Sequence, residues 1–213
     1  MFNKKILVFD LGGVIIDLHV DRSFRALAEM GVAPALLTEA GSLVNATMQA
    51  YDRGDISTGK FFGYLASFVP QEVRDSMGDR LHDTLCSIWN MMLGDFREAK
   101  LNRIKGLRQM GFRVVMLSNT NEAHWPEIER KFFAAAGEPL GDCFDALYLS
   151  YRMRRRKPEP DIFLELLAAE NAVPGDCVFF DDSAENCAAA RALGIEAVQV
   201  ERNSGWDNLF IDD

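Results

Sequence analysis

Acidic residues follow directly on short apolar runs near both ends of this chain. Near the start, Asp10 closes the run KILVFD at 5–10. Near the end, Asp181 and Asp182 follow the run CVFF at 177–180. Such runs, rich in β-branched and aromatic residues, are typical of strands buried on both faces. Open α/β sheets bind ligands at the carboxyl ends of their strands. Because three carboxylates gathered there repel one another unless a cation lies between them, the pattern predicts a Mg²⁺ site.

Asp10 is the candidate nucleophile. An aspartate carboxylate can accept a phosphoryl group as a covalent intermediate, which divides a difficult hydrolysis into two easier steps. Gly12 and Gly13 follow it and allow a tight turn that brings backbone groups close to a ligand. Taken alone, this segment fits a buried aspartate that caps a turn about equally well.

Polar residues also end other predicted elements. Ser118 and Asn119 close the run 112–117 and offer a hydroxyl and an amide to a phosphate oxygen. A helix cap is the simpler explanation of this pair when it is taken alone. Lys157 ends the basic run 152–157, where it would balance the nucleophile and the phosphate while the arginines stay solvated. The competing interpretation of that run is a solvated loop.

Asp181 and Asp182 are the candidate metal ligands. Mg²⁺ prefers oxygen ligands and usually takes one or two carboxylates together with water and substrate phosphate. Two helix-capping acids are the alternative, but adjacent acids directly after four apolar residues favour the metal site. Ser183 and Asn186 are expected to brace this loop. The scattered histidines are interpreted as surface or cap residues: His19, His82 and His124.

The elements that must position these residues alternate in type over the second half of the chain. Alternating strand-like and helix-like segments predict βαβ units and a parallel sheet. We expect strands at 112–117, 144–150, 177–180 and 195–200. We expect helices at 95–111, 122–136, 161–170 and 183–194. The first of these helices has Asp95 as its expected cap and Gly111 as its left-handed stop.

Residues 18–94 differ, because they carry helical periodicity and almost no strand-like runs. Three apolar faces are visible there: Phe24, Leu27, Ala28 and Gly31; Phe61, Phe62, Leu65 and Phe68; Leu81, Leu85, Ile88 and Trp89. We therefore predict an α/β fold, with a doubly wound, Rossmann-like parallel sheet built from residues 1–17 and 95–213. An all-helical domain at 18–94 is inserted in it, and the segment after Val200 has no predicted element.

Composition excludes several classes of function. The 213 residues are 48% hydrophobic, enough for a substantial core. The formal net charge is −9, from 32 acidic and 23 basic residues, which argues against nucleic acid and anionic membranes as partners. No apolar stretch is long enough for a membrane span, and the start is not a signal peptide. Four cysteines without paired spacing predict free thiols and a cytoplasmic location. The oligomeric state stays open.

The order of four segments resembles the motifs of the haloacid dehalogenase superfamily of hydrolases. The segments read FDLGGV at 9–14, LSNTN at 117–121, RKPEP at 156–160 and FFDDSAEN at 179–186. The helical insert after the first motif looks like the helical cap of that family. Within the family, the chain looks most like bacterial alpha-glucose-1-phosphate phosphatases and related sugar-phosphate phosphatases. The segments that carry this closer likeness are 51–57, 114–121 and 148–159.

The resemblance implies a Mg²⁺-dependent phosphatase that acts on a small phosphomonoester. Asp10 would be the nucleophile and a Mg²⁺ ligand. Asp182 would ligate Mg²⁺ directly, and Asp181 would assist directly or through water. The metal would stabilise charge on the transferring group. The implied substrate-binding positions are Gly12, Gly13, Ser118, Asn119 and Lys157, of which Ser118 and Lys157 also count as catalytic.

One departure from the family pattern concerns Gly12, where the commonest phosphatases have a second aspartate as general acid and base. The carbonyl of Gly12 can still ligate Mg²⁺, but its proton-transfer role is vacant, and such help is typically worth ~10²–10⁴-fold. We expect the substrate to tolerate the gap, because an anomeric phosphate leaves a relatively acidic hemiacetal oxygen. Three residues near the start of the insert are further candidates for the proton donor: Asp17, His19 and Asp21.

Two alternatives stay open at this point. A 2-haloacid dehalogenase resembles the same family and also uses an aspartate nucleophile, but it needs no metal and would not gain from Asp181 and Asp182. A catalytically impaired, phosphatase-like binding protein would hold a ligand without turnover. The presence of Asp10, Ser118 and Lys157, together with Asp181 and Asp182, argues against it.

Overall fold

A five-stranded parallel sheet forms the centre of the protein. The structure, a computed structural model, describes residues 5–37, 42–204 and 206. The strand order is β5-β4-β1-β6-β7. The bounds are β1 Ile6–Phe9, β4 Arg113–Ser118, β5 Ala146–Leu149, β6 Cys177–Asp181 and β7 Glu196–Gln199. Every expected strand is present, and β1 lies in the middle with β4 and β6 as its neighbours. The α/β fold with a parallel, Rossmann-like core is therefore confirmed.

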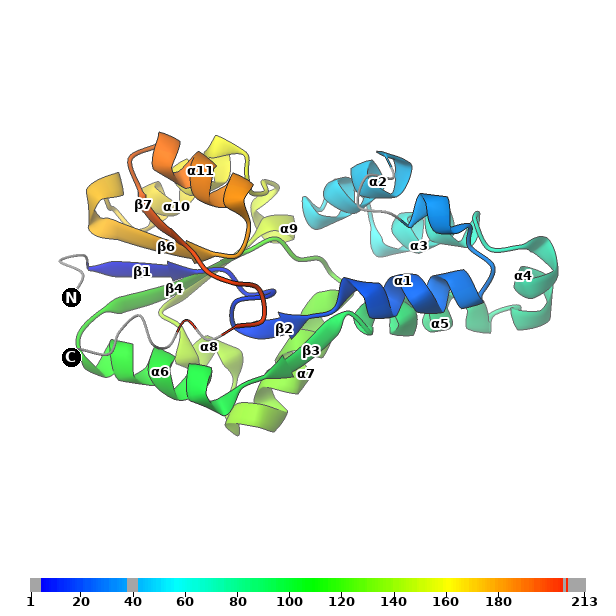
Figure 1. Cartoon of the computed structure of the whole chain (residues 1–213), viewed down its shortest axis with the longest axis horizontal. Helices are drawn as coiled ribbons and strands as arrows, with labels where there is room; N and C mark the ends of the chain where they lie inside the picture. Colours follow the sequence, from blue (N-terminus) through cyan, green and yellow to red (C-terminus); the bar gives the residue numbers. More distant parts are fainter. Residues whose placement is uncertain (1–4, 38–41, 205, 207–213) are drawn as a thin grey trace.

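Helices cover both faces of this sheet because the strand residues alternate between two hydrophobic cores. Ile6 and Val8 of β1 point towards α10 (Pro160–Ala169) and α11 (Ala184–Ala192). Their neighbours Leu7 and Phe9 point the other way. That second face is covered by α6 (Glu98–Gln109) and α7 (His124–Ala136), as Figure 1 shows. Two short helices complete this part of the chain: α8 (Leu140–Cys143) and α9 (Ser150–Met153).

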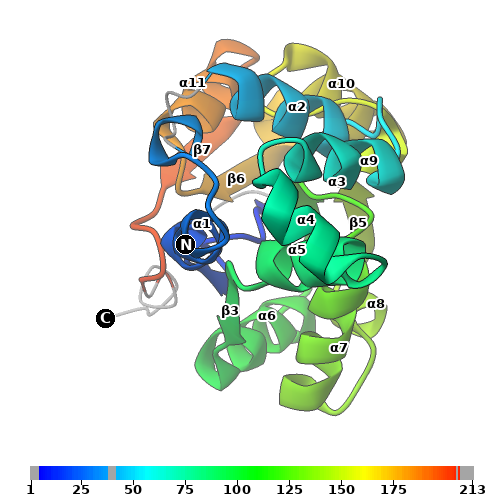
Figure 2. The ribbon, with the colours of Figure 1, turned by 90° about the vertical axis from the view of Figure 1, so that its right-hand side faces the viewer.

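The chain between β2 and β3 is helical, as its periodicity predicts, and it extends beyond one end of the sheet (Figure 1). We call residues 20–90 the helical insert. Its helices are α1 Val20–Glu29, α2 Ser42–Asp52, α3 Thr58–Ala66, α4 Gln71–Met77 and α5 Arg80–Asn90, with a 3₁₀ turn at Pro34–Leu36. Figure 2 shows α2 beside α9, which belongs to the core. The division into two domains stays a prediction.

A two-stranded antiparallel sheet joins the insert to the core. It pairs β2 (Ile16–Leu18) with β3 (Leu93–Phe96), two strands too short and too mixed in composition for the sequence to reveal. The expectation that Asp95 caps a helix is wrong, because Asp95 lies in β3. The next helix, α6, begins at Glu98 after Arg97, whose side chain makes no capping hydrogen bond. Gly111 is left-handed (φ 91°) just past this helix, as expected.

The segment after β7 runs across the loop that follows β1 (Figure 1). We call residues 200–204 and 206 the C-terminal segment. Asn203 donates its backbone N–H to the carbonyl of Gly13 at 2.7 Å, and its side-chain oxygen accepts from Leu18 N at 2.7 Å. Trp206 donates from Nε1 to the carbonyl of Val14 at 2.9 Å, and its ring centroid lies 4.6 Å from that of Phe9. The end of the described chain therefore holds the loop that carries Gly12 and Gly13.

Candidate active site

Three carboxylates meet at the carboxyl edge of the sheet, where the sequence predicts them. Asp10 follows β1, Asp181 is the last residue of β6, and Asp182 comes directly after it. Each offers an oxygen, and these atoms all lie within 4.8 Å of one another. Neighbouring parallel strands end at the same edge, so the register of β1 with β6 produces this cluster.

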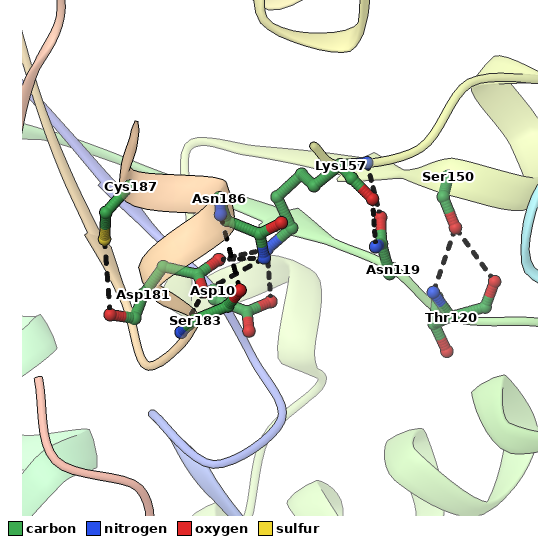
Figure 3. A network of polar contacts seen from close by, with 9 residues as sticks. All are labelled: Asp10, Asn119, Thr120, Ser150, Lys157, Asp181, Ser183, Asn186 and Cys187. Atoms are coloured by element: carbon green, nitrogen blue, oxygen red, sulfur yellow. Dashed lines mark hydrogen bonds and ion pairs between the residues drawn. The ribbon is translucent and has the colours of Figure 1, made fainter. Parts of the chain in front are cut away.

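Lys157 lies between two of these acids (Figure 3). Its Nζ is 2.7 Å from Oδ1 of Asp10 and 2.7 Å from Oδ2 of Asp181. The lysine is 1% exposed, and its ammonium lies 5.2 Å from the ring centroid of Phe179. Water is thus largely excluded from this ion triad, and its attraction is stronger than that of a surface pair.

Asn119 fixes the backbone of Lys157. Its side-chain oxygen accepts from Lys157 N at 2.9 Å, and its Nδ2 donates to Lys157 O at 2.9 Å (Figure 3). Asn119, which the sequence predicts to contact phosphate, thus holds the loop that carries Lys157. Ser118, at the end of β4, is 2% exposed and lines the cavity described below.

The carboxylate of Asp181 accepts four hydrogen bonds, and the residue is fully buried. Oδ1 accepts from Ser183 N at 2.8 Å and from Asn186 Nδ2 at 3.0 Å. Oδ2 accepts from Lys157 Nζ at 2.7 Å and also from Asn186 Nδ2, at 3.0 Å. Ser183 caps α11 by accepting from Asn186 N, so both residues brace this loop as expected.

Asp182 forms an ion pair with Arg202 of the C-terminal segment, in which Nε donates to Oδ2. Gly13 lies against the same carboxylate. A Cβ added at this glycine would be 2.9 Å from Asp182 Oδ2, and its φ of +79° already disfavours other residues. Gly13 therefore allows the loop after β1 to approach Asp182 closely.

The charges of this site are not balanced by the described residues. Burial raises the pKa of Asp10 to about 7; Lys157 opposes that rise and Asp181 adds to it. Burial alone would lower the pKa of Lys157, but the attraction of Asp10 and Asp181 raises it above its ordinary value. When all three carboxylates are ionised, Lys157 and Arg202 balance two of them, and one negative charge is left over before a phosphate ester arrives. A divalent cation fits this donor set, since all three ligands are oxygens.

A cavity of about 170 Å³ opens beside Gly12, Ser118 and Asn119. Most of its lining is apolar, from both the core and the helical insert: Leu11, Ile16, Leu18, Val20, Met48, Met92, Leu93 and Ile128. The insert also contributes Asp52, the last residue of α2, and Trp89 of α5. A small substrate bound there would touch both parts of the chain.

His124 lines this cavity and is buried, so its interpretation as a surface residue is wrong. Its ring stacks on Trp89 at a centroid distance of 5.4 Å and an angle of 3°. Nδ1 lies 2.7 Å from Oδ1 of Asn90. Burial lowers the pKa of His124 to about 3, which keeps the imidazole neutral.

The other candidate proton donors are not among the residues that line the cavity. Asp17 pairs with Arg97 at 2.9 Å, and Asp21 pairs with Arg25 at 3.1 Å on the surface of α1. His19 precedes α1 and donates its backbone N–H to the carbonyl of Met92.

Two residues of the candidate site, Asp52 and Arg202, were not predicted from the sequence. Asp52 lies just before Gly54, and a glycine at that position indicates only that a helix ends there. Nothing in the sequence distinguishes Arg202 from the other arginines.

The basic run 152–157 divides into separate contacts instead of one solvated patch. The Arg152 guanidinium lies 5.5 Å from the ring centroid of Trp125, and Arg155 pairs with Glu165 at 2.8 Å.

The four cysteines are free thiols, as expected. Within the ranges that the structure describes, no helix combines the length and apolar character needed to cross a membrane.

Comparisons with known proteins point to one family. A family model described as haloacid dehalogenase-like hydrolase matches residues 4–194. The D-ribitol-5-phosphate phosphatase of Bacteroides thetaiotaomicron is 31% identical over 95% of this chain and 94% of its own length. A crystal structure of a HAD family enzyme from the same organism, in complex with magnesium and inorganic phosphate, superposes with a TM-score of 0.82. It is 30% identical and covers 98% of this chain and 100% of its own. A predicted HAD-like hydrolase from Porphyromonas gingivalis has a TM-score of 0.79 at 26% identity, over 95% of this chain and 94% of its own.

Proposed function

Because this chain belongs to the haloacid dehalogenase-like hydrolase family, we propose that it is a Mg²⁺-dependent sugar-phosphate phosphatase that works through a phosphorylated Asp10. The family match and the phosphatase relative support a phosphoric monoester hydrolase. The observation that carries the proposal is the buried contact of Lys157 with both Asp10 and Asp181, beside the ligand atom of Asp182. A dehalogenase that needs no metal would gain nothing from this concentration of negative charge.

Asp10 and Asp182 would hold the metal, with the carbonyl of Gly12 as a third protein ligand. Asp181 would assist through water, because both of its oxygens already accept hydrogen bonds. When bound, Mg²⁺ supplies positive charge to the transferring phosphoryl group and to the carboxylates around it. The magnesium in the related crystal structure belongs to that enzyme and supports the choice of metal here.

The protein residues then divide the chemistry between them. Asp10 Oδ attacks phosphorus, a bond forms between these atoms, and the bond from phosphorus to the leaving oxygen breaks. Ser118 donates a hydrogen bond to a phosphoryl oxygen, and the Lys157 ammonium favours the ionised form of Asp10 and holds it in place. Water next attacks phosphorus, which releases inorganic phosphate and restores the Asp10 carboxylate.

The helical insert would act as a cap. Under this proposal residues 1–17 and 95–213 form the catalytic core. Residues 18–94, which contain the helical insert, close over the substrate. The insert supplies part of the cavity lining, through Met48, Asp52 and Trp89. A lid that completes a site excludes water and selects among substrates. The small cavity and the pentitol phosphate named for the relative from Bacteroides thetaiotaomicron support a small sugar or polyol phosphate.

Phosphate release from a panel of sugar and polyol phosphates, with Mg²⁺ or with a chelator, tests this proposal. We expect turnover that the chelator abolishes and that Asp10→Asn removes. Asp95→Asn, which changes an exposed acid of β3, is the matched control and should leave turnover unchanged. Circular dichroism would confirm that both variants are folded. Turnover that survives Asp10→Asn would overturn the proposal, and chloride release from a 2-haloacid would support the dehalogenase instead.

A further inference from the structure

The reaction needs a proton for the leaving oxygen, and the acids of the metal cluster are committed elsewhere. Asp10 is the proposed nucleophile, Asp181 holds Lys157, and Asp182 is the proposed metal ligand paired with Arg202. Lys157 is held charged between two carboxylates, which opposes proton donation. The alkoxide of a polyol, or of a sugar at a non-anomeric position, is a poorer leaving group than an anomeric oxygen, so we look for a donor in the rest of the cavity wall.

Only two titratable side chains line that cavity among the described residues, Asp52 and His124. The imidazole of His124 is neutral and stacked, and its Nδ1 is occupied by Asn90. Neutral imidazole is a weak acid, so His124 is poorly suited to protonate an alkoxide at neutral pH. Asp52 is the remaining group with an exchangeable acidic proton.

Asp52 belongs to the helical insert but is fastened to the core. Asn121, three residues after Ser118, donates from Nδ2 to Asp52 Oδ1 at 2.9 Å. The hydroxyl of Ser150 donates to the backbone carbonyl of Asp52. Ser150 also accepts from Thr120 N at 2.9 Å, which joins Asp52 to the loop after β4 (Figure 3 shows Ser150 and Thr120). These contacts therefore hold the Asp52 carboxyl at the cavity that is also lined by Ser118, the proposed phosphate-binding residue.

The second oxygen of this carboxyl has no hydrogen-bond partner in the part of the chain that the structure describes. Only Oδ1 is bonded, by Asn121. Burial raises the pKa of Asp52 to about 6, against the opposing effects of the Asn121 amide and the Arg156 charge. The group is thus largely protonated below about pH 6 and only partly protonated above it, and one of its oxygens is available to a ligand.

We propose that Asp52, which the insert supplies to the cavity that Gly12 also lines, is the general acid and base of this phosphatase. The inference rests on the proposed function. As the bond from phosphorus to the leaving oxygen breaks, the Asp52 proton moves to that oxygen and the free alcohol departs. The Asp52 carboxylate then accepts a proton from the water that attacks phosphorus on Asp10. Inorganic phosphate leaves, and both aspartates return to their starting states.

A series of phosphate esters with leaving groups of graded acidity tests this role. For Asp52→Asn we expect kcat/KM to fall by ~10²–10⁴-fold on alkyl and sugar phosphates. On nitrophenyl phosphate, whose phenolate leaves without a proton, the change should be small. The dependence of kcat/KM on leaving-group acidity should therefore steepen in this variant, and Asp52→Glu should restore part of the lost activity. Asp55→Asn alters an exposed acid just past α2 and should match the wild type on every ester.

The pH profile of the unmodified enzyme gives a second test that needs no variant. Activity on a sugar phosphate should fall above about pH 6 as Asp52 loses its proton, whereas activity on nitrophenyl phosphate should not show that fall. An unchanged leaving-group dependence in Asp52→Asn, with only a higher KM for sugar phosphates, would overturn the proposal and make Asp52 a contact for a substrate hydroxyl. Turnover that survives Asp10→Asn would contradict the proposed function instead, so the two failures are distinguishable.

Discussion

Lys157 and Asp181 form an ion pair that is closed to solvent. Their side chains are 1% and 0% exposed, and Nζ lies 2.7 Å from Oδ2. The same ammonium also contacts Asp10, so one buried cation pairs with two carboxylates at the ends of neighbouring strands. Stability and the proposed chemistry therefore depend on the same lysine.

Replacing this lysine by methionine should damage both properties. Lys157→Met leaves two buried carboxylates without their ammonium, and breaking a buried pair costs about 3–5 kcal/mol. Urea unfolding should show that loss in the free energy of unfolding, and phosphate release should fall at least ~10²-fold. Lys105→Met removes a partly exposed partner of Glu138 and should change neither quantity much. A stable, active Lys157→Met variant would contradict this account of the site.

Mg²⁺ should stabilise the folded protein through Asp182. A ligand that binds only the folded state at 100 times its Kd adds about 2.7 kcal/mol of stability. Thermal unfolding with Mg²⁺ and with a chelator should show a higher Tm in the presence of the metal. Asp182→Asn removes one ligand charge and should reduce that difference, whereas Asp95→Asn should keep it. If the full Mg²⁺ effect persisted in Asp182→Asn, the metal would bind elsewhere.

His124 should make the protein sensitive to acid. Its pKa is lowered from 6.5 to about 3 in the fold, so the unfolded chain binds the extra proton first. Stability from the neutral imidazole is complete above pH 6.5 and decreases as the pH falls towards 3, by at most about 1.4 kcal/mol per pH unit. His124→Gln keeps a neutral polar group and should lose less stability than the wild type between pH 6.5 and 4. Urea unfolding at several pH values would measure the free energy of unfolding of both proteins. If it decreased equally in the wild type and in His124→Gln, His124 would not account for the sensitivity to acid.

Trp206 should stabilise the loop after β1. It is 1% exposed, contacts the Phe9 ring and donates to the Val14 carbonyl. Trp206→Ala removes a fully buried aromatic side chain, which typically costs about 3–5 kcal/mol. Turnover should fall as well, because the released loop carries Gly12 and Gly13. Phe133→Ala removes an aromatic ring that is 57% exposed and should have a much smaller effect on both measurements.

Much of the fold could be predicted because its signals are local. The strands β1 and β6 are buried on both faces, so each is a short apolar run that ends in acid. The glycine at 111 marks the end of α6 for the same local reason. The strands β2 and β3, which join the insert to the core, could not be predicted, since they are three and four residues long and pair with each other across the whole insert.

The site was predictable in part. Asp10, Lys157 and the acids after β6 are brought together as their strand positions imply. Asp52 could not be identified, because Asn121 and Ser150 bring it to the cavity through contacts between distant segments. The buried state of His124 depends in the same way on Trp89 and Asn90.

The central place of β1 has a consequence for biosynthesis. A ribosome makes this strand first, yet both of its partners in the sheet, β4 and β6, are made much later. Until Asp181 has left the ribosome, Lys157 has only one of its two carboxylates and β1 keeps an unpaired edge. Nascent chains with exposed apolar strands are prone to aggregate. Newly made protein should therefore depend on chaperones at least until β6 has been synthesised, and the candidate active site should assemble only after that point.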